Sequence, residues 1–529
     1  MRNFKIKMIM RKIYFKTGIV AMIFVLIAGF TISTSAQNVR YIDVEPGIGT
    51  LNEAINGDTT DTGARVDTFN TVYRLKRVEN IYYISELIEN IDYPLTVVAE
   101  EGEGPRPYLA LKADEDGNNP GYCFRAKGDL TIKGLHLTLV DDLGAVERRV
   151  VRASADDITI KVDNCWFDDA STNAFRIDNS ENKLFLTNSV FSNIGDPGNP
   201  NNGRAIDDRG NDIDTLVIED CTFYNITSRL LRDGGGHIKY CKINHNTFVN
   251  AGGSRGFDFG VIAGLDFTNN IAHNVGYVPQ DTTSSRALIM IDPISQELLD
   301  MGFTQSINIS NNNWFNDPAL YTQGYLDTMV ISQPLNLSQD TWDLVDSTAI
   351  VESFYHENVN FENVPDDQSI LDQIKHQLDD DFLVEDTPDW ILPDPTNGIY
   401  HLDVPFSFNY SNSVAATGAT DGGQLGDRNW TASPTVGIAN AKQLSNSMRV
   451  YPTPANSNVN IEFSIDNRER VQMTVFDLSG QKVSSLVNKI YPAGSHRVNW
   501  DLSSKLKSGI YLINMQAGDI VSTARLIVR

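Results

Sequence analysis

Arginine recurs at fixed places in a short segment that the middle of the chain repeats. A large apolar residue stands third in every copy, and arginine or aspartate usually occupies the first or the fourth place. A guanidinium binds a planar carboxylate through two hydrogen bonds, so a row of arginines can hold a linear polyanion or pair with neighbouring aspartates. The copies are residues 149–152, 173–176, 204–207, 229–232 and 255–258, and residues 286–289 continue the series.

The arginines of these segments form the candidate binding surface. We expect the apolar third place to point into a core, so the alternation of a strand turns the fourth place outward. One interpretation is a ladder of arginine–aspartate pairs that supports the fold. The other is a cationic groove for an acidic polysaccharide such as pectate, alginate or a glycosaminoglycan, and both stay open. In the second interpretation the substrate-binding residues are Arg152, Arg176, Arg204, Arg229 and Arg255.

The same stretch holds the residue types that an eliminating enzyme needs. Removal of the C5 proton of a uronate polymer requires a base, a proton donor for the leaving oxygen and a cation that neutralises the carboxylate. A dense positive field lowers the pKa of a cationic base, so Arg232 or Lys239 is the candidate base, and His237 is the candidate donor or base. Ca²⁺ takes six to eight oxygen ligands. Its candidate ligands are Asp207, Asp208, Asp233 and Asp258.

Two other functions compete with such a Ca²⁺-assisted lyase. Hydrolysis by paired carboxylates would use Asp207 and Asp208, but neighbouring residues of a strand point to opposite faces, so at most one of them faces a groove. A non-catalytic glycan-binding or adhesive surface protein needs only the arginine row and aromatic rings that stack on sugars. The candidate rings are Trp314, Tyr321, Tyr325, Trp342 and Trp390.

The elements that position these residues are short strands repeated along the chain. Each has alternating apolar residues, then Asn, Asp or His, then a small or polar residue and, two places later, usually Phe. A long repeat with one period-two strand motif per turn predicts a solenoid, whereas helical repeats show a period of about 3.6 residues. The simplest architecture is a parallel β-helix with coils about 4.8 Å apart. The repeats cover residues 158–167, 184–191, 216–223, 242–248 and 265–272.

Cysteines and asparagines in these repeats have structural interpretations. Cys165 and Cys221 share one column, but two coil steps separate them by about 9–10 Å, beyond the ~7 Å Cα limit for a disulfide. We therefore expect both thiols to be unpaired in the core. Asn tolerates left-handed backbone angles, and stacked Asn side chains hydrogen-bond along a ladder, which predicts structural turn residues. These residues are Asn164, Asn188, Asn246 and Asn269.

With these repeats, residues 38–437 resemble the right-handed parallel β-helix of pectate-lyase and chondroitinase-B-like proteins. GTLNEAIN at 49–56 resembles their opening amphipathic cap, and ATGATDGGQLGDRNW at 416–430 resembles the closing coil of exported bacterial members. Lyases of this type use Ca²⁺ held by acidic residues, with Lys or Arg as base, so the resemblance implies β-elimination. A weaker resemblance to polygalacturonase-like glycoside hydrolases rests on Asp207, Asp208, His237 and Lys239.

Both ends of the chain carry export signals. Basic residues precede the apolar run 18–30, which is followed by small residues, so residues 1–36 are predicted to be a signal peptide. Residues 446–529 contain YPTP and alternating strands between Gly- and Asn-rich turns, which predicts a small β-sandwich. They resemble the C-terminal sorting domain of type IX secretion substrates in Bacteroidetes. The resemblance implies the type IX secretion machinery as a partner and delivery to the cell surface or the medium.

Composition limits the partners and the class of protein. With 43 Lys+Arg and 68 Asp+Glu, the formal net charge of −25 argues against nucleic acid as a partner. After the signal peptide, no stretch approaches the ~18 apolar residues of a transmembrane span. We therefore predict an exported, all-β chain. Its parts are a cap with the first coils at 37–119, the β-helix body at 120–316, inserted loops with a closing coil at 317–437, and the β-sandwich at 446–529.

Overall fold

The computed structural model describes two compact units, Met1–Ala432 and Ser433–Arg529, each taken by itself below. The predicted signal peptide, residues 1–36, lies outside the described residues. The described residues are 39–58, 65, 70–195, 202–251, 255–276, 287–317, 335–345, 353–365, 403–433, 448–465, 469–477, 482–502, 506–517 and 520–528.

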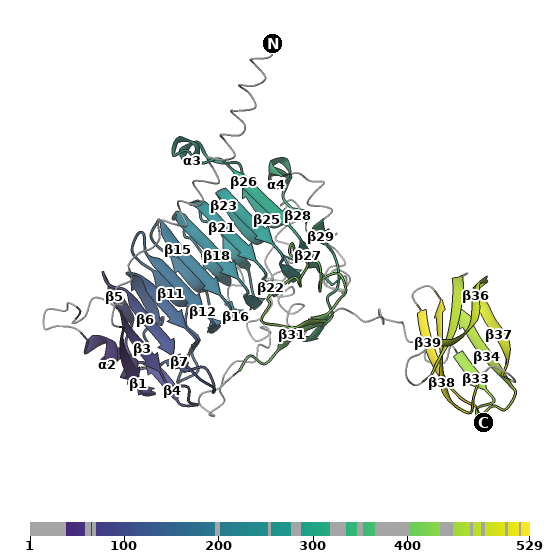
Figure 1. Ribbon diagram of the computed structural model, residues 1–529. Helices are drawn as coiled ribbons and strands as arrows, with labels where there is room; N and C mark the ends of the chain where they lie inside the picture. The colour runs from purple at the N-terminus through teal and green to yellow at the C-terminus, as the bar shows by residue number, and fades with distance from the viewer. Residues whose placement is uncertain are drawn as a thin grey trace, which may run out of the picture. The chain divides into compact units, whose positions relative to one another are not determined.

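Two parallel sheets form the larger unit, and in its middle each coil adds two strands to the first sheet and one to the second (Figure 1). The first sheet contains β1 (Arg40–Val44), β3 (Thr71–Leu75), β5 (Ile88–Ile91), β6 (Leu95–Ala99), β8 (Phe124–Lys127), β9 (Leu130–Lys133), β11 (Arg149–Ala153), β12 (Thr159–Asp163), β14 (Asn173–Ile177), β15 (Asn182–Thr187), β17 (Arg204–Asp207), β18 (Ile213–Glu219), β20 (Arg229–Arg232), β21 (His237–Asn244), β23 (Arg255–Thr268), β25 (Ala287–Asp292), β26 (Ser306–Ser310) and β28 (Leu335–Leu337). The second contains β2 (Gly47–Ile48), β4 (Ile81–Ile84), β7 (Tyr108–Leu111), β10 (His136–Asp141), β13 (Trp166–Ala170), β16 (Val190–Ile194), β19 (Thr222–Ile226), β22 (Thr247–Ala251), β24 (Ile271–Val275), β27 (Asn312–Phe315) and β29 (Phe354–Tyr355).

The repeated arginine segments stack in register on the first sheet. Their third places pair from coil to coil, so that Val151 lies beside Phe175 and Phe175 beside Ile206. All three side chains are buried, which confirms the expected inward direction of this place. The same register aligns the fourth places, which are Arg152, Arg176, Asp207 and Arg232.

Phenylalanine rings and cysteine thiols fill the core between the sheets. Ring centroids of successive coils lie 4.6–5.3 Å apart, close enough for stacked and edge-to-face packing. The thiols of Cys165 and Cys221 are buried and free, as expected, and those of Cys123 and Cys241 are too. Phe191, Phe223 and Phe248 are stacked, and Phe167 packs edge to face against Phe191.

The corner between the two sheets uses left-handed backbone angles. Asn164, Asn188 and Asn269 have φ of 52°, 50° and 61°, which confirms their expected place at a tight corner. Asn246 differs, because the preceding His245 takes the left-handed place with φ of 55°. The corner column also contains Asp220 and Asn311.

Asn246 belongs to a buried amide ladder one place further along the chain. Its Nδ2 donates to Oδ1 of Asn270 over 3.0 Å, and Nδ2 of Asn270 donates to Oδ1 of Asn312 over 3.0 Å. Each Oδ1 also accepts the backbone N–H of the coil before it, at 2.9 Å in both cases. The ladder therefore satisfies backbone and side-chain groups together, as buried polar groups require.

Residues 403–430, hereafter the strap, lie along the outer side of the second sheet (Figure 1). Nδ2 of Asn311 donates to the carbonyl of Gly418 over 2.7 Å, and the backbone N of Thr420 donates to Oδ1 of Asn269 over 2.8 Å. Further along, the guanidinium of Arg428 binds Asp220, which lies two coils before Asn269. The stretch expected to form a closing coil at 416–430 thus runs back across several coils instead.

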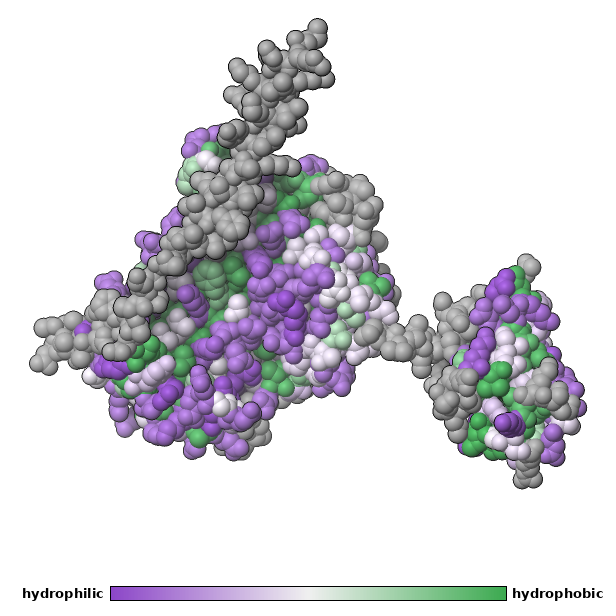
Figure 2. All heavy atoms as spheres, viewed as in Figure 1, coloured by the Kyte–Doolittle hydropathy of each residue, from purple (hydrophilic) through white to green (hydrophobic). Residues whose placement is uncertain are grey.

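Short elements complete the larger unit. The helices are α2 (Thr50–Asn56), α3 (Gln296–Asp300) and α4 (Gln339–Leu344), and β30 (Phe361–Asn363), β31 (Ser407–Ser411) and β32 (Ala432–Ser433) form a small sheet. In the described part of the chain, no helix is long and apolar enough to cross a membrane. Hydrophilic residues cover most of the described surface that Figure 2 shows.

The C-terminal unit consists of two antiparallel sheets around its own core. Apolar side chains such as Ile461, Met473 and Ile513 are fully buried in it. The expected fold class, a parallel β-helix followed by a small C-terminal β-sandwich, is confirmed. One sheet contains β33 (Met448–Tyr451), β34 (Asn458–Ile465) and β37 (Gly494–Asp501), and the other contains β35 (Glu469–Asp477), β36 (Lys482–Tyr491), β38 (Gly509–Ala517) and β39 (Ile520–Val528).

Candidate functional site

The candidate substrate-binding arginines share carboxylates with their neighbours. Arg152 and Arg176 both bind Asp178, with Nε of Arg176 at 2.7 Å from Oδ1. Arg229 and Arg255 both bind Oδ2 of Asp258, at 3.0 Å and 2.7 Å. The structure therefore brings the arginines of the column together, and it also gives them partners from their own chain.

Asp207 serves a third group of guanidiniums. Its carboxylate accepts hydrogen bonds from Nη1 of Arg204 at 3.3 Å and Nη1 of Arg232 at 3.0 Å, and Nη1 of Arg209 lies 3.9 Å away. Among the described residues, seven arginines of the column thus share three carboxylates. These seven arginines and three aspartates, together with Arg149, are called the arginine column below.

Burial lowers the pKa of three guanidiniums in this column, those of Arg149, Arg204 and Arg229. Neighbouring guanidiniums lower it further. Nε of Arg149 is buried and has no hydrogen-bond partner among the described residues. The column therefore carries more positive charge than its own carboxylates compensate.

The candidate catalytic residues each pair with a different carboxylate. Lys239, on β21, binds Glu181, and its Nζ lies 3.9 Å from Asp214. Nδ1 of His237 lies 3.6 Å from Asp212 and 3.9 Å from Glu297. Arg232, on β20, belongs to the group around Asp207. These contacts tie the three side chains to separate carboxylates.

The candidate calcium ligands do not form a cage of oxygen atoms. Asp207 and Asp258 are engaged by arginines, as described above. Oδ1 of Asp208 accepts the backbone N–H of Gly210 and of Gly234 at 2.9 Å and 2.6 Å, and burial raises the pKa of Asp208 to about 7. Asp233 accepts the N–H of Gly235 instead. In the described part of the chain no three His, Cys, Asp or Glu side chains gather as a metal site, so a bound Ca²⁺ stays a prediction.

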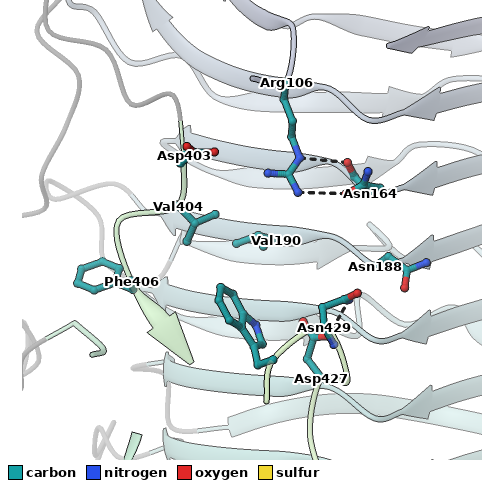
Figure 3. A pocket seen from close by; sticks show the side chains of 10 residues that line it. Arg106, Asn164, Asn188, Val190, Asp403, Val404, Phe406, Asp427 and Asn429 are labelled. Carbon is teal, nitrogen blue, oxygen red and sulfur yellow. Dashed lines mark hydrogen bonds between the residues drawn. The ribbon is translucent and has the colours of Figure 1, made fainter. Parts of the chain in front are cut away.

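A cavity of about 330 Å³ lies between the strap and the corner of the β-helix (Figure 3). The β-helix contributes polar side chains from the corner, and the strap contributes both carboxylates and aromatic rings. Six of the ten lining residues are polar or charged, and four are apolar. The lining residues are Arg106, Asn164, Asn188, Val190, Asp403, Val404, Phe406, Asp427, Asn429 and Trp430.

Hydrogen bonds fix the strap side of this cavity. Nε1 of Trp430 donates to Oγ1 of Thr222 over 2.8 Å, and Oγ1 of Thr222 donates to Oδ2 of Asp427 over 2.7 Å. The backbone N of Asp427 donates to Oγ1 of Thr247 over 3.0 Å. Burial raises the pKa of Asp427 to about 7. The cavity wall is therefore held by strands β19 and β22.

The aromatic candidates of the sequence do not line this cavity. Trp314 is buried, and its Nε1 donates to the carbonyl of Val275 over 3.3 Å. Tyr321, Tyr325 and Trp390 lie outside the described residues, and so does the side chain of Trp342. Sequence reasoning missed the ring of Trp430, because the segment that contains it, residues 416–430, was expected to form a closing coil.

Comparison with known proteins bears on the C-terminal unit. Residues 449–529 match the family model of the secretion system C-terminal sorting domain. The chain ends in a sorting domain. This sorting domain indicates export with the participation of the type IX secretion machinery. No curated protein matches the chain.

Proposed function

We propose that this exported protein binds a linear acidic polysaccharide along the arginine column, at the cell surface or in the medium, without cleaving it. The observation that carries the proposal is the excess of guanidiniums, since seven arginines share three carboxylates among the described residues. Each guanidinium has five N–H donors, so one shared carboxylate leaves donors for a ligand.

The geometry of a β-helix supports this class of ligand. Coils repeat about every 4.8 Å along the helix axis, and a sugar residue of a polymer is about as long. A uronate chain lying along the column could therefore present one carboxylate per coil. The side chains of Arg152, Arg176 and Arg232 are 27%, 24% and 27% exposed, so part of each guanidinium is open to solvent.

Paired substitutions test the proposal on the full exported chain. The double variant Arg152→Gln/Arg176→Gln should weaken retention on immobilised polygalacturonate, alginate or glycosaminoglycan by about tenfold or more, because charge-assisted hydrogen bonds are lost. Arg74→Gln/Lys76→Gln is the matched control, since these exposed side chains also pair with carboxylates but lie in β3 and just after it, outside the arginine column. Equal retention of both double variants, with unchanged thermal unfolding, would contradict the proposal.

Elimination is the second candidate activity, and the same polymers test it. Arg232 is the candidate base that belongs to the arginine column, whereas Lys239 is tied to Glu181 and Asp214. If an unsaturated, ultraviolet-absorbing product forms when Ca²⁺ is present, the protein is a lyase, and the proposal of binding without cleavage is wrong. Loss of that product in Arg232→Gln, with its retention in Lys239→Gln, would then assign the base to Arg232.

A further inference from the structure

Arg106 is the cation of the cavity beside the strap. No carboxylate of the described residues lies within ion-pair distance of it, although the charge of Asp403 acts on it from further away. Arg106 donates from Nε to the carbonyl of Asn164 over 3.3 Å and from Nη2 to Oδ1 of the same residue over 3.1 Å. These bonds leave Nη1 without a partner among the described residues. In Figure 3 the third nitrogen of the guanidinium points away from Asn164, toward the side of Asp403.

Burial makes this guanidinium a strong anion-binding group. Arg106 is half-buried, and desolvation lowers its pKa. A ligand carboxylate that replaces the lost water would bind it through short, charge-assisted hydrogen bonds. Asn164 holds the guanidinium plane from one side, so the open edge is oriented before any ligand arrives.

The rest of the lining selects a ring with an apolar face and hydroxyl groups. Trp430 and Phe406 supply aromatic surface, on which the C–H face of a sugar packs. Asp403 and the side-chain carbonyl of Asn429 supply acceptors for hydroxyl groups, while Asp427 is occupied by Thr222 and by Asn429. A volume of about 330 Å³ lies at the small end of ligand pockets, which suits a single sugar ring.

We propose that this cavity is a second glycan site, separate from the arginine column, which takes a single uronic acid residue. The ligand carboxylate binds Arg106, and the sugar ring packs on Trp430. The site lies on the outer side of the second sheet, whereas the arginine column belongs to the first. The inference therefore stands whether or not a polymer binds the column, and a short ligand tests it separately.

Titration calorimetry of the full exported chain with methyl glucuronide and methyl galacturonide provides the test. We expect saturable binding of at least one of them, much weaker binding of the neutral methyl glucoside, and no binding of acetate, which lacks a ring. Arg106→Gln should weaken the uronide by about ten- to a hundredfold, the value of a charge-assisted hydrogen bond. Arg74→Gln is the control, because this arginine also makes a hydrogen bond within the chain, to Asp43, but does not line the cavity.

Three results of the same calorimetry would overturn the proposal. Absence of binding to the unmodified chain, or equal affinity for the uronide and the neutral glucoside, would overturn it. Equal affinity for acetate would mean a carboxylate site without sugar recognition and would overturn it as well. A second readout is the tryptophan fluorescence change on binding, which should disappear in Trp430→Phe. The double variant Arg152→Gln/Arg176→Gln should keep uronide binding, which distinguishes this site from the arginine column.

Discussion

Two adjacent carboxyl groups of β13 are buried together. Oδ1 of Asp168 accepts hydrogen bonds from Oγ of Ser192 at 2.6 Å and from Nδ2 of Asn193 at 3.1 Å, and the same amide reaches Asp169 at 3.2 Å. Burial raises the pKa of Asp168 to about 7, and burial with the charge of Asp168 raises that of Asp169 well above its ordinary value. The pair therefore keeps protons at a pH where exposed aspartates are ionised.

Replacement of Asp168 by Asn should make the β-helix less sensitive to pH. The folded-state pKa exceeds the ordinary value of about 3.9, so the stabilising contribution of protonated Asp168 is complete below about pH 4 and is lost as the pH rises through about 7. Relative to Asp168→Asn, the unmodified chain should lose about 3 kcal/mol of unfolding free energy between about pH 5 and about pH 8, as measured by urea unfolding. Asp43→Asn is the control, since Arg74 lowers the pKa of that exposed carboxyl and it does not titrate in this range. If the unfolding free energies of Asp168→Asn and the unmodified chain differ by the same amount at every pH, the raised pKa of Asp168 is wrong.

At the scale of elements, the amide ladder holds consecutive coils at one corner. Asn270 is the middle member: its Nδ2 donates to Ile243 and to Asn312, and its Oδ1 accepts from the backbone and side chain of Asn246. The residue is 1% exposed, so water cannot replace these bonds. Loss of the amide would leave several buried groups unsatisfied at once.

Asn270→Ala should accordingly lower the unfolding free energy by at least about 2 kcal/mol, since each buried group left unsatisfied costs about 1–3 kcal/mol. Asn308→Ala provides the comparison, because Asn308 is exposed and binds one carboxylate, Asp266. It should change the unfolding free energy by no more than about 0.5 kcal/mol. Similar losses in both variants, measured by chemical unfolding, would show that the ladder adds no particular stability.

The repeats determine which parts of the fold could be predicted from the sequence. Because the spacing of residues within one coil recurs along the chain, the pairing of Val151 with Phe175 and the free thiol of Cys165 could be predicted. Pairing with Asp207 and Asp258 was one of the two interpretations of the segments, whereas pairing of Arg152 and Arg176 with Asp178 could not be predicted, because Asp178 lies outside the repeated segments. The cavity could not be predicted either. Arg106 and Trp430 line one cavity only because the strap folds back along the coils, and the repeats do not encode the path of the strap.

At the scale of the whole molecule, the two units have separate hydrophobic cores. One core contains Phe191 and the other Met473, and the two clusters have no residue in common. Calorimetry of the full chain should therefore show two unfolding transitions. Met473→Ala should lower the midpoint temperature of the transition of the C-terminal unit, and Phe191→Ala that of the larger unit. Each variant should lose about 2–5 kcal/mol of unfolding free energy in its own unit. A single transition that both variants shift would mean that the units unfold together.

The strap has a consequence for how this molecule can evolve. Repeat proteins commonly gain or lose whole coils, because each coil contacts only its neighbours. Here Asn311, Asn269 and Asp220 all bind one continuous segment on the side of the helix. A coil inserted between them would move its partners apart by about 4.8 Å, more than one residue of extended chain spans. Duplication of a coil in this stretch therefore requires a matching insertion in the strap, so the strap fixes the number of coils that it crosses.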